Sequence, residues 1–290
     1  MTAPLGPGPL VWLASYPKSG NTWMRVLLAH YQGDGEEALD LTTPERGGIS
    51  SHRPHFDELL GIPSSDLTDD EVEVLRPDVF RALAAEADDP VLVKVHDAHQ
   101  ATPAGAPLFP PEVTRAAVYL VRDPRDVAVS AAFHAGHGDL DRSIRRLGSP
   151  EHGIGGAPRR QLRQRLGSWS DHVRSWTGAV LPVPVVVVRY EDLVADTAGQ
   201  LERVVDALGG RADAHAERLA RAVARSSFDR LRAAEDEHGF RERTRRQQRF
   251  FRSGTVGDWR NHLTDAQAAR VVADHGAVMA ELGYIDREPG

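Results

Sequence analysis

The sequence contains no cysteine, which excludes disulfide bonds, a thiol nucleophile and metal sites built on thiolates. Lysine is nearly absent as well, because Lys18 and Lys94 are the only lysines among the 35 Lys and Arg residues. No apolar run approaches the roughly 20 residues that cross a bilayer as a helix, so we expect no membrane span. The first ten residues, MTAPLGPGPL, have no basic region and no apolar core. We therefore expect a short flexible tail over residues 1–9, no secretory signal and a cytoplasmic protein.

The composition is that of an ordinary folded protein: of 290 residues, 41% are hydrophobic and 27% are charged. This length fits one large domain, which we expect to cover residues 10–290. The formal net charge of −7 argues against a general nucleic-acid binder, whose domain is usually basic. A small polyanion held by a local group of cations is compatible with the same charge.

The scarcity of lysine draws attention to the two lysines that are present. Lysine carries a compact charge on a flexible stem, whereas arginine presents a wide planar fork, so the two residues are not interchangeable. Lys18 and Lys94 are therefore candidates for positions that arginine cannot serve, and chance survival at the surface is the alternative.

Four short apolar runs predict buried strands at residues 10–14, 91–95, 117–121 and 185–189. Helical patterns alternate with these runs at residues 22–31, 70–86, 124–135 and 161–179, followed by 196–225 with a break near Gly209–Gly210, and by 264–282. Asp123 and Thr264 are predicted N-caps. Strand alternating with helix predicts an α/β fold with a central parallel β-sheet flanked by helices. In such folds ligands bind beyond the carboxyl ends of the strands.

The first strand is followed by the loop SYPKSGNTW at residues 15–23 and then by a helix. Backbone N–H groups at a helix N-terminus attract anions, and Lys18 adds a mobile cation. The loop is P-loop-like but does not match the GxxxxGKS/T pattern, because Gly20 follows the lysine. An ordinary strand-to-helix turn is the alternative.

The second strand ends in Lys94, Val95 and His96. Strand residues two apart point to the same face, so Lys94 and His96 are predicted to project together. A neutral histidine can accept a proton from an attacking hydroxyl near neutral pH. A structural histidine is the alternative reading of His96, and His99 is a rival for the role of base.

The third strand is followed by Arg122 and, further along the next helix, by Ser130, which together suit a phosphate. Local ion pairs among Asp123, Arg125 and Asp126 are the alternative. Tyr190, after the fourth strand, is either a core aromatic or a ligand hydrogen bonder.

Residues 241–252 contain six arginines and precede a glycine-rich stretch at 253–259. We interpret these two segments as a basic flap over an anion; a solvated basic loop is the alternative.

Together these motifs resemble those of the PAPS-dependent sulfotransferases of the cytosolic type, and most closely the bacterial small-molecule enzymes. The similar segments are SYPKSGNTW (15–23), KVH (94–96), VRDPRDVAVS (121–130), VRYEDL (188–193), Ser226 to Phe228, and FRSGTVGDWRNHLT (251–264). The resemblance covers about residues 10–265 in the family's order. It implies a sulfuryl transfer from PAPS to a hydroxyl of a small-molecule acceptor, with PAP as the product.

The resemblance also implies the roles of individual residues. His96 would be the general base, with Lys18 and Lys94 as further catalytic residues near the transferring group. The PAPS-binding residues would be Lys18, Ser19, Gly20, Asn21, Thr22, Trp23, Arg122, Ser130, Tyr190, Ser226, Phe228, Arg252, Ser253 and Gly254. Among them, Trp23 and Phe228 would flank the adenine, while Arg122 and Ser130 would hold the 3′-phosphate. Because positioning and charge stabilisation dominate such transfers, we expect no metal requirement.

The sequence departs from the family pattern in three places. Asn21 stands where the family usually has Thr, and Ser253 stands where it usually has Lys, which weakens one expected 3′-phosphate contact. The stretch after Trp259 lacks the Val and Glu of the family's short dimer motif, so the oligomeric state, monomer or dimer, is left open. We expect the acceptor pocket to be built largely from the loops 34–69, 97–115, 136–160 and 235–250, with His134 and His137 among the residues that line it.

Three other functions share some of these features. A P-loop-type nucleotide kinase shares the loop and the fold class but needs a metal-binding acid. A non-enzymatic nucleotide sensor would bind PAP without transfer. A sulfotransferase that uses an aryl sulfate as donor would not need the 3′-phosphate motif.

Overall fold

The computed structural model describes residues 4–33, 48–136, 138–156, 161–178, 183–211, 213–240, 242–243 and 249–286. His137, most of the arginine-rich segment 241–248 and part of the expected acceptor loops lie outside these residues. The chain divides into two compact units. The first comprises residues 1–16, 45–120 and 149–187, and the second comprises residues 17–44, 121–148 and 188–290. The expected single domain over residues 10–290 stays a prediction.

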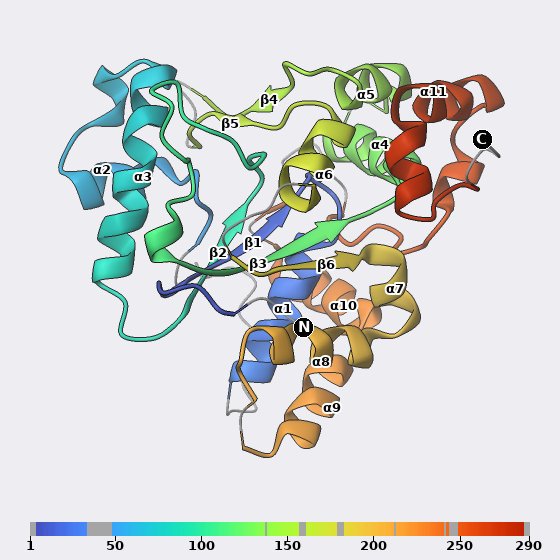
Figure 1. Cartoon of the computed structure of the whole chain (residues 1–290). Helices are drawn as coiled ribbons and strands as arrows, with labels where there is room; N and C mark the ends of the chain where they lie inside the picture. The colour runs from blue at the N-terminus through green and yellow to red at the C-terminus, as the bar shows by residue number, and fades with distance from the viewer. Residues whose placement is uncertain are drawn as a thin grey trace. The chain divides into compact units, whose positions relative to one another are not determined.

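The fold is mixed α/β around a four-stranded sheet in the order β2-β1-β3-β6 (Figure 1). The strands are β1 (Leu10–Ser15), β2 (Val91–Val95), β3 (Thr114–Val121) and β6 (Val185–Arg189). β1 pairs in parallel with both β2 and β3. Every residue of β1 is buried, as expected for a central strand that is covered on both faces. The four strands and the parallel sheet predicted from the apolar runs are therefore confirmed.

In the first unit, helices pack on the sheet through aromatic side chains. The helical elements of this unit are α2 (Arg53–Leu60), η1 (Ser64–Asp66), α3 (Asp69–Ala85), η2 (Pro111–Val113) and α6 (Trp169–Thr177). The ring of Trp12 on β1 lies 4.9 Å from that of Phe80 on α3. The ring of Tyr119 on β3 stacks 6.1 Å from that of Trp176 on α6. These contacts fix α3 and α6 against the sheet, as predicted for an α/β fold.

The second unit is mainly helical, with α1 (Asn21–Gln32), α4 (Pro124–His134), α5 (Leu140–Leu147), α7 (Tyr190–Ala195), α8 (Thr197–Ala207), α9 (His215–Arg225), α10 (Phe228–His238), η3 (Asp258–Asn261) and α11 (Asp265–Glu281). Helices α4, α5 and α11 lie side by side, and α1 packs on α9 (Figure 1). The predicted N-caps are confirmed: the side chain of Asp123 accepts from the Arg125 N–H, and Thr264 forms a capping box with Gln267. The predicted break near Gly209–Gly210 is confirmed between α8 and α9.

The helix predicted over residues 161–179 is wrong in its first half. Residues 164–165 form a short strand, β5 (Gln164–Arg165), which pairs antiparallel with β4 (Gly153–Ile154). Helix α6 begins at Trp169 because the Ser168 side chain accepts from the Asp171 N–H, and Gly167 before it has a φ of 68°. The amphipathic pattern alone did not reveal this cap. The sequence prediction also missed α2, α5, α7 and α10, most of which are short.

Residues 4–9 fall in the expected flexible tail. The Gly6 N–H donates to the carbonyl oxygen of Arg115 over 2.8 Å, and the Pro9 carbonyl accepts from the Val91 N–H over 3.0 Å. The tail boundary itself stays a prediction.

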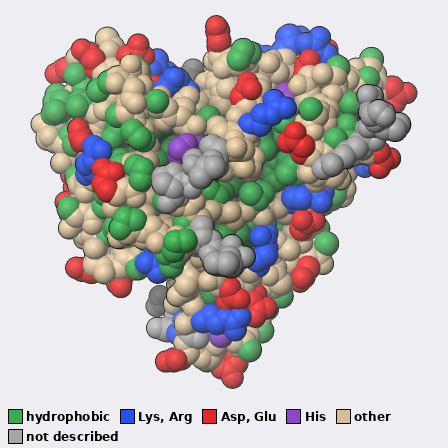
Figure 2. Space-filling view, in the orientation of Figure 1, with side chains coloured by type: hydrophobic (Ala, Val, Ile, Leu, Met, Phe, Trp, Pro, Cys, Tyr) green, Lys and Arg blue, Asp and Glu red, His purple; other side chains and the backbone are tan. Residues whose placement is uncertain are grey.

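Among the described residues, no helix combines the length and the apolar character that a membrane span needs. On the face shown in Figure 2, acidic and basic side chains are interspersed rather than gathered by sign.

Candidate functional site

The backbone of the loop after β1 has left-handed conformations at two positions just before α1 begins. Lys18 has a φ of 74° and Gly20 a φ of 97°, and Gly20 is the N-cap of α1. A Cβ atom at Gly20 would lie 2.7 Å from Cδ2 of Tyr190, so the position requires glycine for space as well as for conformation. In α1, all of which is described, the first turn holds no acidic residue and no side chain caps the N-terminus. The positive end of the helix is thus suited to an anion.

Two hydroxyls of this loop region differ in their surroundings. Ser19 is fully buried, and no hydrogen-bond partner reaches its Oγ among the described residues. An unsatisfied buried hydroxyl is costly, so a ligand atom is a natural partner for it. Thr22 Oγ1, in contrast, donates to Oε2 of Glu242 over 2.9 Å. Nη2 of Arg25 donates to the other oxygen of the same carboxylate over 2.8 Å.

The ammonium group of Lys18 is docked on two side chains of the second unit. Its Nζ lies 3.5 Å from Nδ1 of His134 and 4.3 Å from the centre of the Phe250 ring. An ammonium group only donates, so Nδ1 of His134 accepts in this contact. His134 was expected among the residues that line the acceptor pocket, whereas Phe250 was not predicted as a site residue.

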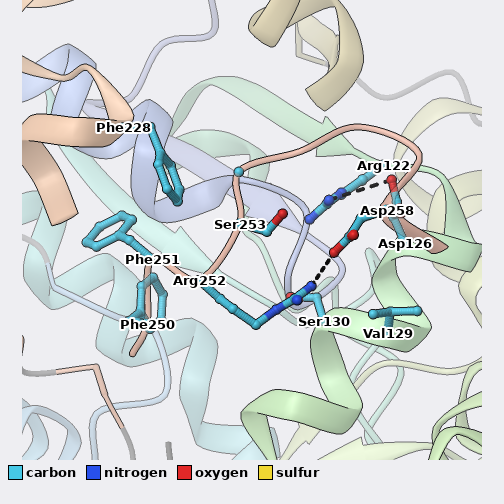
Figure 3. A pocket seen from close by; sticks show the side chains of 11 residues that line it. Arg122, Asp126, Val129, Ser130, Phe228, Phe250, Phe251, Arg252, Ser253 and Asp258 are labelled. Atoms are coloured by element: carbon cyan, nitrogen blue, oxygen red, sulfur yellow. Dashed lines mark hydrogen bonds and ion pairs between the residues drawn. The ribbon is translucent and has the colours of Figure 1, made fainter. Parts of the chain in front are cut away.

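A pocket in the second unit lies between α4, the start of α10 and the segment that precedes η3 (Figure 3). It is lined by Arg122, Asp126, Val129, Ser130, Phe228, Phe250, Phe251, Arg252, Ser253, Gly254 and Asp258. Six of the predicted nucleotide-binding residues are among them, although they come from parts of the chain about a hundred residues apart. The two arginines and the serine hydroxyls provide hydrogen-bond donors for an anion.

Each arginine of the pocket is held by a carboxylate. Nη2 of Arg122 lies 3.6 Å from Oδ2 of Asp126 and donates to the Thr255 carbonyl over 3.0 Å. Nη2 of Arg252 lies 2.5 Å from Oδ2 of Asp258. Figure 3 marks both pairs with dashed lines. Burial alone would raise the pKa of Asp258, but hydrogen bonds from Asn261 and Arg252 bring it below its usual range.

The buried Asp126 also fixes the glycine-rich segment over the pocket. Its Oδ2 accepts from the Gly257 N–H and its Oδ1 from the Trp259 N–H, both over 2.8 Å. Local ion pairs among Asp123, Arg125 and Asp126 were the alternative for this segment, and that alternative holds only in part. Asp123 and Arg125 do form a close pair, with 2.7 Å between Oδ2 and Nη2.

Aromatic side chains form the neighbourhood of the pocket. The Arg122 guanidinium lies 4.3 Å from the centre of the Tyr190 ring, and the Tyr190 hydroxyl donates to the Gly254 carbonyl over 3.1 Å. Burial raises the pKa of Tyr190, so the hydroxyl stays a donor. A Cβ atom at Gly254, where φ is 68°, would lie 2.6 Å from Cδ2 of Phe228. The glycine therefore allows the backbone to approach this ring closely.

Trp23 and Ser226 are held by contacts inside the second unit. The indole Nε1–H of Trp23 donates to the Ser226 carbonyl over 2.8 Å, and its ring lies 5.9 Å from that of Tyr190. The Ser226 hydroxyl lies 2.9 Å from Nδ1 of His30. Ser226 is buried, and its hydroxyl already has His30 as a partner within the protein.

His96 and Lys94 lie at the end of β2 in the first unit. Nδ1 of His96 is 2.9 Å from the Ser15 carbonyl oxygen and 3.4 Å from the Ser15 hydroxyl. A carbonyl only accepts, so Nδ1 carries the hydrogen in the neutral ring and Nε2 keeps its lone pair. Lys94 is buried at the last but one position of β2. The rival His99 instead packs its ring 5.7 Å from Phe109 and 5.1 Å from Trp176, and burial lowers its pKa.

Buried polar groups fix the backbone around His96. Nε2 of His172 lies 3.0 Å from the His96 carbonyl oxygen, and Nδ1 of His172 lies 2.9 Å from the Tyr119 hydroxyl. The next residue, Asp97, forms a buried ion pair with Arg76, with 2.7 Å between Oδ2 and Nη2. The position of His96 is therefore set by residues from α3, β3 and α6.

Comparison with known proteins decides the family. The family model described as the sulfotransferase domain matches residues 9–283. The chain belongs to the sulfotransferase family. The resemblance to the PAPS-dependent sulfotransferase family that was drawn from the motifs is thereby confirmed.

Curated relatives of this sulfotransferase include Sulfotransferase 2A2 of Mus musculus, which is 25% identical over 259 residues, covering 88% of this chain and 79% of the relative. Sulfotransferase 2A1 of Mus musculus is 32% identical over 156 residues. That match covers 52% of this chain and 52% of the relative, so it spans about half of each protein.

Two solved structures show that the fold of this sulfotransferase is a known one. Mouse sulfotransferase SULT7A1 complexed with PAP has a TM-score of 0.60 at 20% identity, covering 95% of this chain and 86% of the other. Retinol dehydratase in complex with retinol and PAP has a TM-score of 0.61 at 22% identity, covering 99% of this chain and 84% of the other. The likeness establishes the mixed α/β fold with its central parallel sheet.

In this sulfotransferase, the structure gathers part of the predicted site. Arg122, Ser130, Phe228, Arg252, Ser253 and Gly254 line one pocket, and Tyr190 lies against it. Lys18, Ser19, Gly20, Asn21, Thr22, Trp23 and Ser226 belong to the same unit but do not line that pocket, and Lys94 and His96 belong to the first unit. Sequence reasoning missed Asp258, Phe251 and Glu242 because nothing local in the sequence indicates their partners. For Asp126 a weak signal existed, since it lies one helical turn after Arg122.

Proposed function

We propose that the protein transfers a sulfuryl group from PAPS to a hydroxyl of a small-molecule acceptor. The observation that carries this proposal is the pocket in which two arginines, Ser130 and the backbone at Gly254 converge. Two arginines with a serine hydroxyl suit a dianionic phosphate such as the 3′-phosphate of PAPS. Arg122 Nε is buried without a hydrogen-bond partner among the described residues, which leaves a donor for such an anion.

The remaining parts of the nucleotide have suitable partners in the second unit. The 5′-phosphosulfate would lie on the loop of Lys18 to Thr22, where the buried Ser19 hydroxyl lacks a partner among the described residues and the helix N-terminus is positive. The adenine would lie between Trp23 and Phe228. Ser253 in place of lysine removes one cation, and Arg252 remains beside it as a donor. The residues that are present thus fit PAPS.

In the proposed reaction, Nε2 of His96 accepts the proton of the acceptor hydroxyl. The hydrogen bond from Nδ1 to the Ser15 carbonyl holds the ring in the tautomer in which Nε2 carries the lone pair that accepts a proton. The acceptor oxygen bonds to sulfur while the bond from sulfur to the bridging phosphate oxygen breaks. Lys18 stabilises the charge that develops on that leaving oxygen. Lys94 assists in stabilising charge near the reacting oxygen atoms.

The acceptor is proposed at the level of its chemistry alone. One solved structure of similar fold is described with retinol and another with androsterone, both small hydroxyl compounds bound together with PAP. A small-molecule acceptor is in keeping with these structures. A cytoplasmic location and the oligomeric state stay predictions.

Calorimetric titration with PAP tests the proposal, with adenosine 5′-phosphosulfate as the control that lacks a 3′-phosphate. We expect tight binding of PAP and much weaker binding of the control, followed by PAPS-dependent sulfation in a screen of acceptors. Absence of PAP binding would contradict the proposal and favour an aryl-sulfate donor.

Two alternatives are separated by simple measurements. A nucleotide kinase would be stabilised against thermal unfolding by ATP with Mg²⁺, whereas the proposed enzyme is stabilised by PAP. A nucleotide sensor would bind PAP but show no transfer to any acceptor, and His96→Ala would then change no measurable property.

A further inference from the structure

A carboxylate occupies the place where the donor's anionic group is expected. Glu242 accepts from Thr22 Oγ1 through Oε2 and from Arg25 Nη2 through Oε1, over 2.9 and 2.8 Å. The side chains of Arg25 and Glu242 are 14% and 24% exposed, so the contact is largely shielded from water. Thr22 and Glu242 are 220 residues apart in the sequence. The carboxylate therefore reaches the N-terminal turn of α1 from a distant part of the chain.

Thr22 and Arg25 form a two-point site for an anion. They are three residues apart on α1, which places them on the same side of the helix. A hydroxyl donates one hydrogen, and an arginine fork donates to carboxylate, phosphate and sulfate groups alike. The positive end of α1 favours any negative charge that occupies this place. Thr22 and Arg25, which bind the Glu242 carboxylate, would bind the donor's anionic group by the same interactions.

Thr22 cannot donate its one hydrogen to Glu242 and to a nucleotide at the same time. If the Thr22 hydroxyl donates to the 5′-phosphosulfate, Glu242 must leave, because two negative groups would otherwise share one small space. A static tie between Glu242 and α1 would be consistent with the geometry only if the Thr22 hydroxyl is no ligand of the nucleotide.

We infer that Thr22 and Arg25 form an anion subsite that Glu242 fills in the ligand-free protein, and that the 5′-phosphosulfate of the donor takes this subsite by displacing Glu242. The inference rests on the proposed function and adds Arg25 to the donor-binding residues. Glu242 acts as an internal competitor that lowers the affinity for the donor.

Titration of Glu242→Gln with PAP tests the competition. The amide holds Arg25 and Thr22 less strongly than the carboxylate does, so the Kd for PAP should fall about threefold to tenfold. Adenosine 3′-phosphate, which lacks the 5′-phosphate, should bind with unchanged affinity. The control Glu237→Gln removes the same charge from a side chain that is 75% exposed, and should change neither Kd. An unchanged Kd for PAP in Glu242→Gln overturns the inference, as does an equal gain for both nucleotides.

The part played by Arg25 is tested in the Glu242→Gln background, where its contact with the carboxylate no longer matters. Adding Arg25→Gln should raise the Kd for PAP about threefold to tenfold without changing that for adenosine 3′-phosphate. No change would show that Arg25 only holds Glu242. If the unaltered protein fails to bind PAP at all, the proposed function fails, and this result differs from unchanged binding in the variants.

Discussion

The imidazole of His96 is oriented by the backbone of Ser15, because Nδ1 of His96 lies 2.9 Å from the Ser15 carbonyl oxygen. This bond fixes which ring nitrogen carries the lone pair that can accept a proton. The ring is held from the end of β1, while the carbonyl of His96 itself lies 3.0 Å from Nε2 of His172. Ring and backbone of the proposed base are thus fixed from two different elements.

His96→Ala should abolish sulfuryl transfer and leave PAP affinity nearly intact, since the base acts on the acceptor. General-base catalysis contributes about 10²- to 10⁴-fold to a rate, so kcat should fall by at least that range. Single-turnover transfer and PAP titration measure the two effects. His99→Phe, which keeps a ring between Phe109 and Trp176, should lose far less activity. A large loss of PAP affinity in His96→Ala would argue against the assignment of His96 as the base.

Arg122→Ala should weaken PAP binding by roughly 2–4 kcal/mol, the scale for removing one partner of a buried charge pair. The loss should be confined to nucleotides that carry a 3′-phosphate, so adenosine 5′-phosphosulfate should bind as before. Isothermal titration of both ligands measures this difference. Arg145→Ala, an exposed arginine on α5, is the matched control and should alter neither affinity. Equal affinity of Arg122→Ala and the unaltered protein for PAP would place the 3′-phosphate elsewhere.

Gly254→Ala should disturb the pocket more than its backbone conformation alone explains. Gly254 and Gly138 have φ values of 68° and 63°, but an added Cβ atom lies 2.6 Å from the Phe228 ring at Gly254 and meets nothing within 4 Å at Gly138. Gly138→Ala should cost about 1 kcal/mol of unfolding free energy, from backbone strain. Gly254→Ala should cost more and also lower PAP affinity, as measured by denaturant unfolding and titration. Equal losses of stability in the two variants, with PAP affinity intact, would show that the approach to Phe228 is unimportant.

The parts of the fold that local sequence determines were predictable. The apolar run 185–189 gave a strand with the correct ends, and Asp123 and Thr264 gave two helix starts, because strand burial and capping depend on neighbouring residues. The start of α6 was wrong because the cap at Ser168 lies inside an amphipathic pattern. Contacts across the chain were out of reach: Asp126 bonds to N–H groups 131 and 133 residues away.

The same division holds for the candidate site. Loop motifs identified the residue types of the pocket, since each motif is local. The carboxylates that hold its arginines could not be identified in this way. An aspartate such as Asp258 has the same local sequence pattern as an aspartate on any exposed turn. Glu242 was missed for the same reason, since its partners on α1 are 217 and 220 residues away.

Metal removal should have no effect on the proposed reaction. Lysine, arginine and backbone N–H groups can stabilise the charge of a transferring sulfuryl group, which carries less negative charge than a phosphoryl group. Transfer from PAPS should therefore proceed at the same rate after dialysis against a chelator. Loss of activity with the chelator and its return with Mg²⁺ would contradict this prediction.

The buried His172 predicts a loss of stability in mild acid. Complete burial lowers the pKa of His172 from 6.5 to about 4, although the hydrogen bond to His96 and the charge of Asp97 act in the opposite direction. The unfolded chain therefore binds a proton at this residue at a higher pH than the folded protein does. By linkage, the free energy of unfolding falls as the pH drops from about 6.5 to about 4, by roughly 3 kcal/mol from this residue.

Denaturant unfolding at several pH values between 7 and 4 measures this effect against the variant His172→Gln, whose side chain does not titrate. The variant should be less stable at pH 7, because its amide replaces a ring that contacts both Tyr119 and the His96 carbonyl. Its stability should nevertheless fall less steeply with acid, since one proton-binding difference has been removed while the other histidines are unchanged. Parallel curves for the two proteins would mean that His172 has the same proton affinity in the folded and unfolded states. Burial would then not be what keeps this ring neutral beside the proposed base.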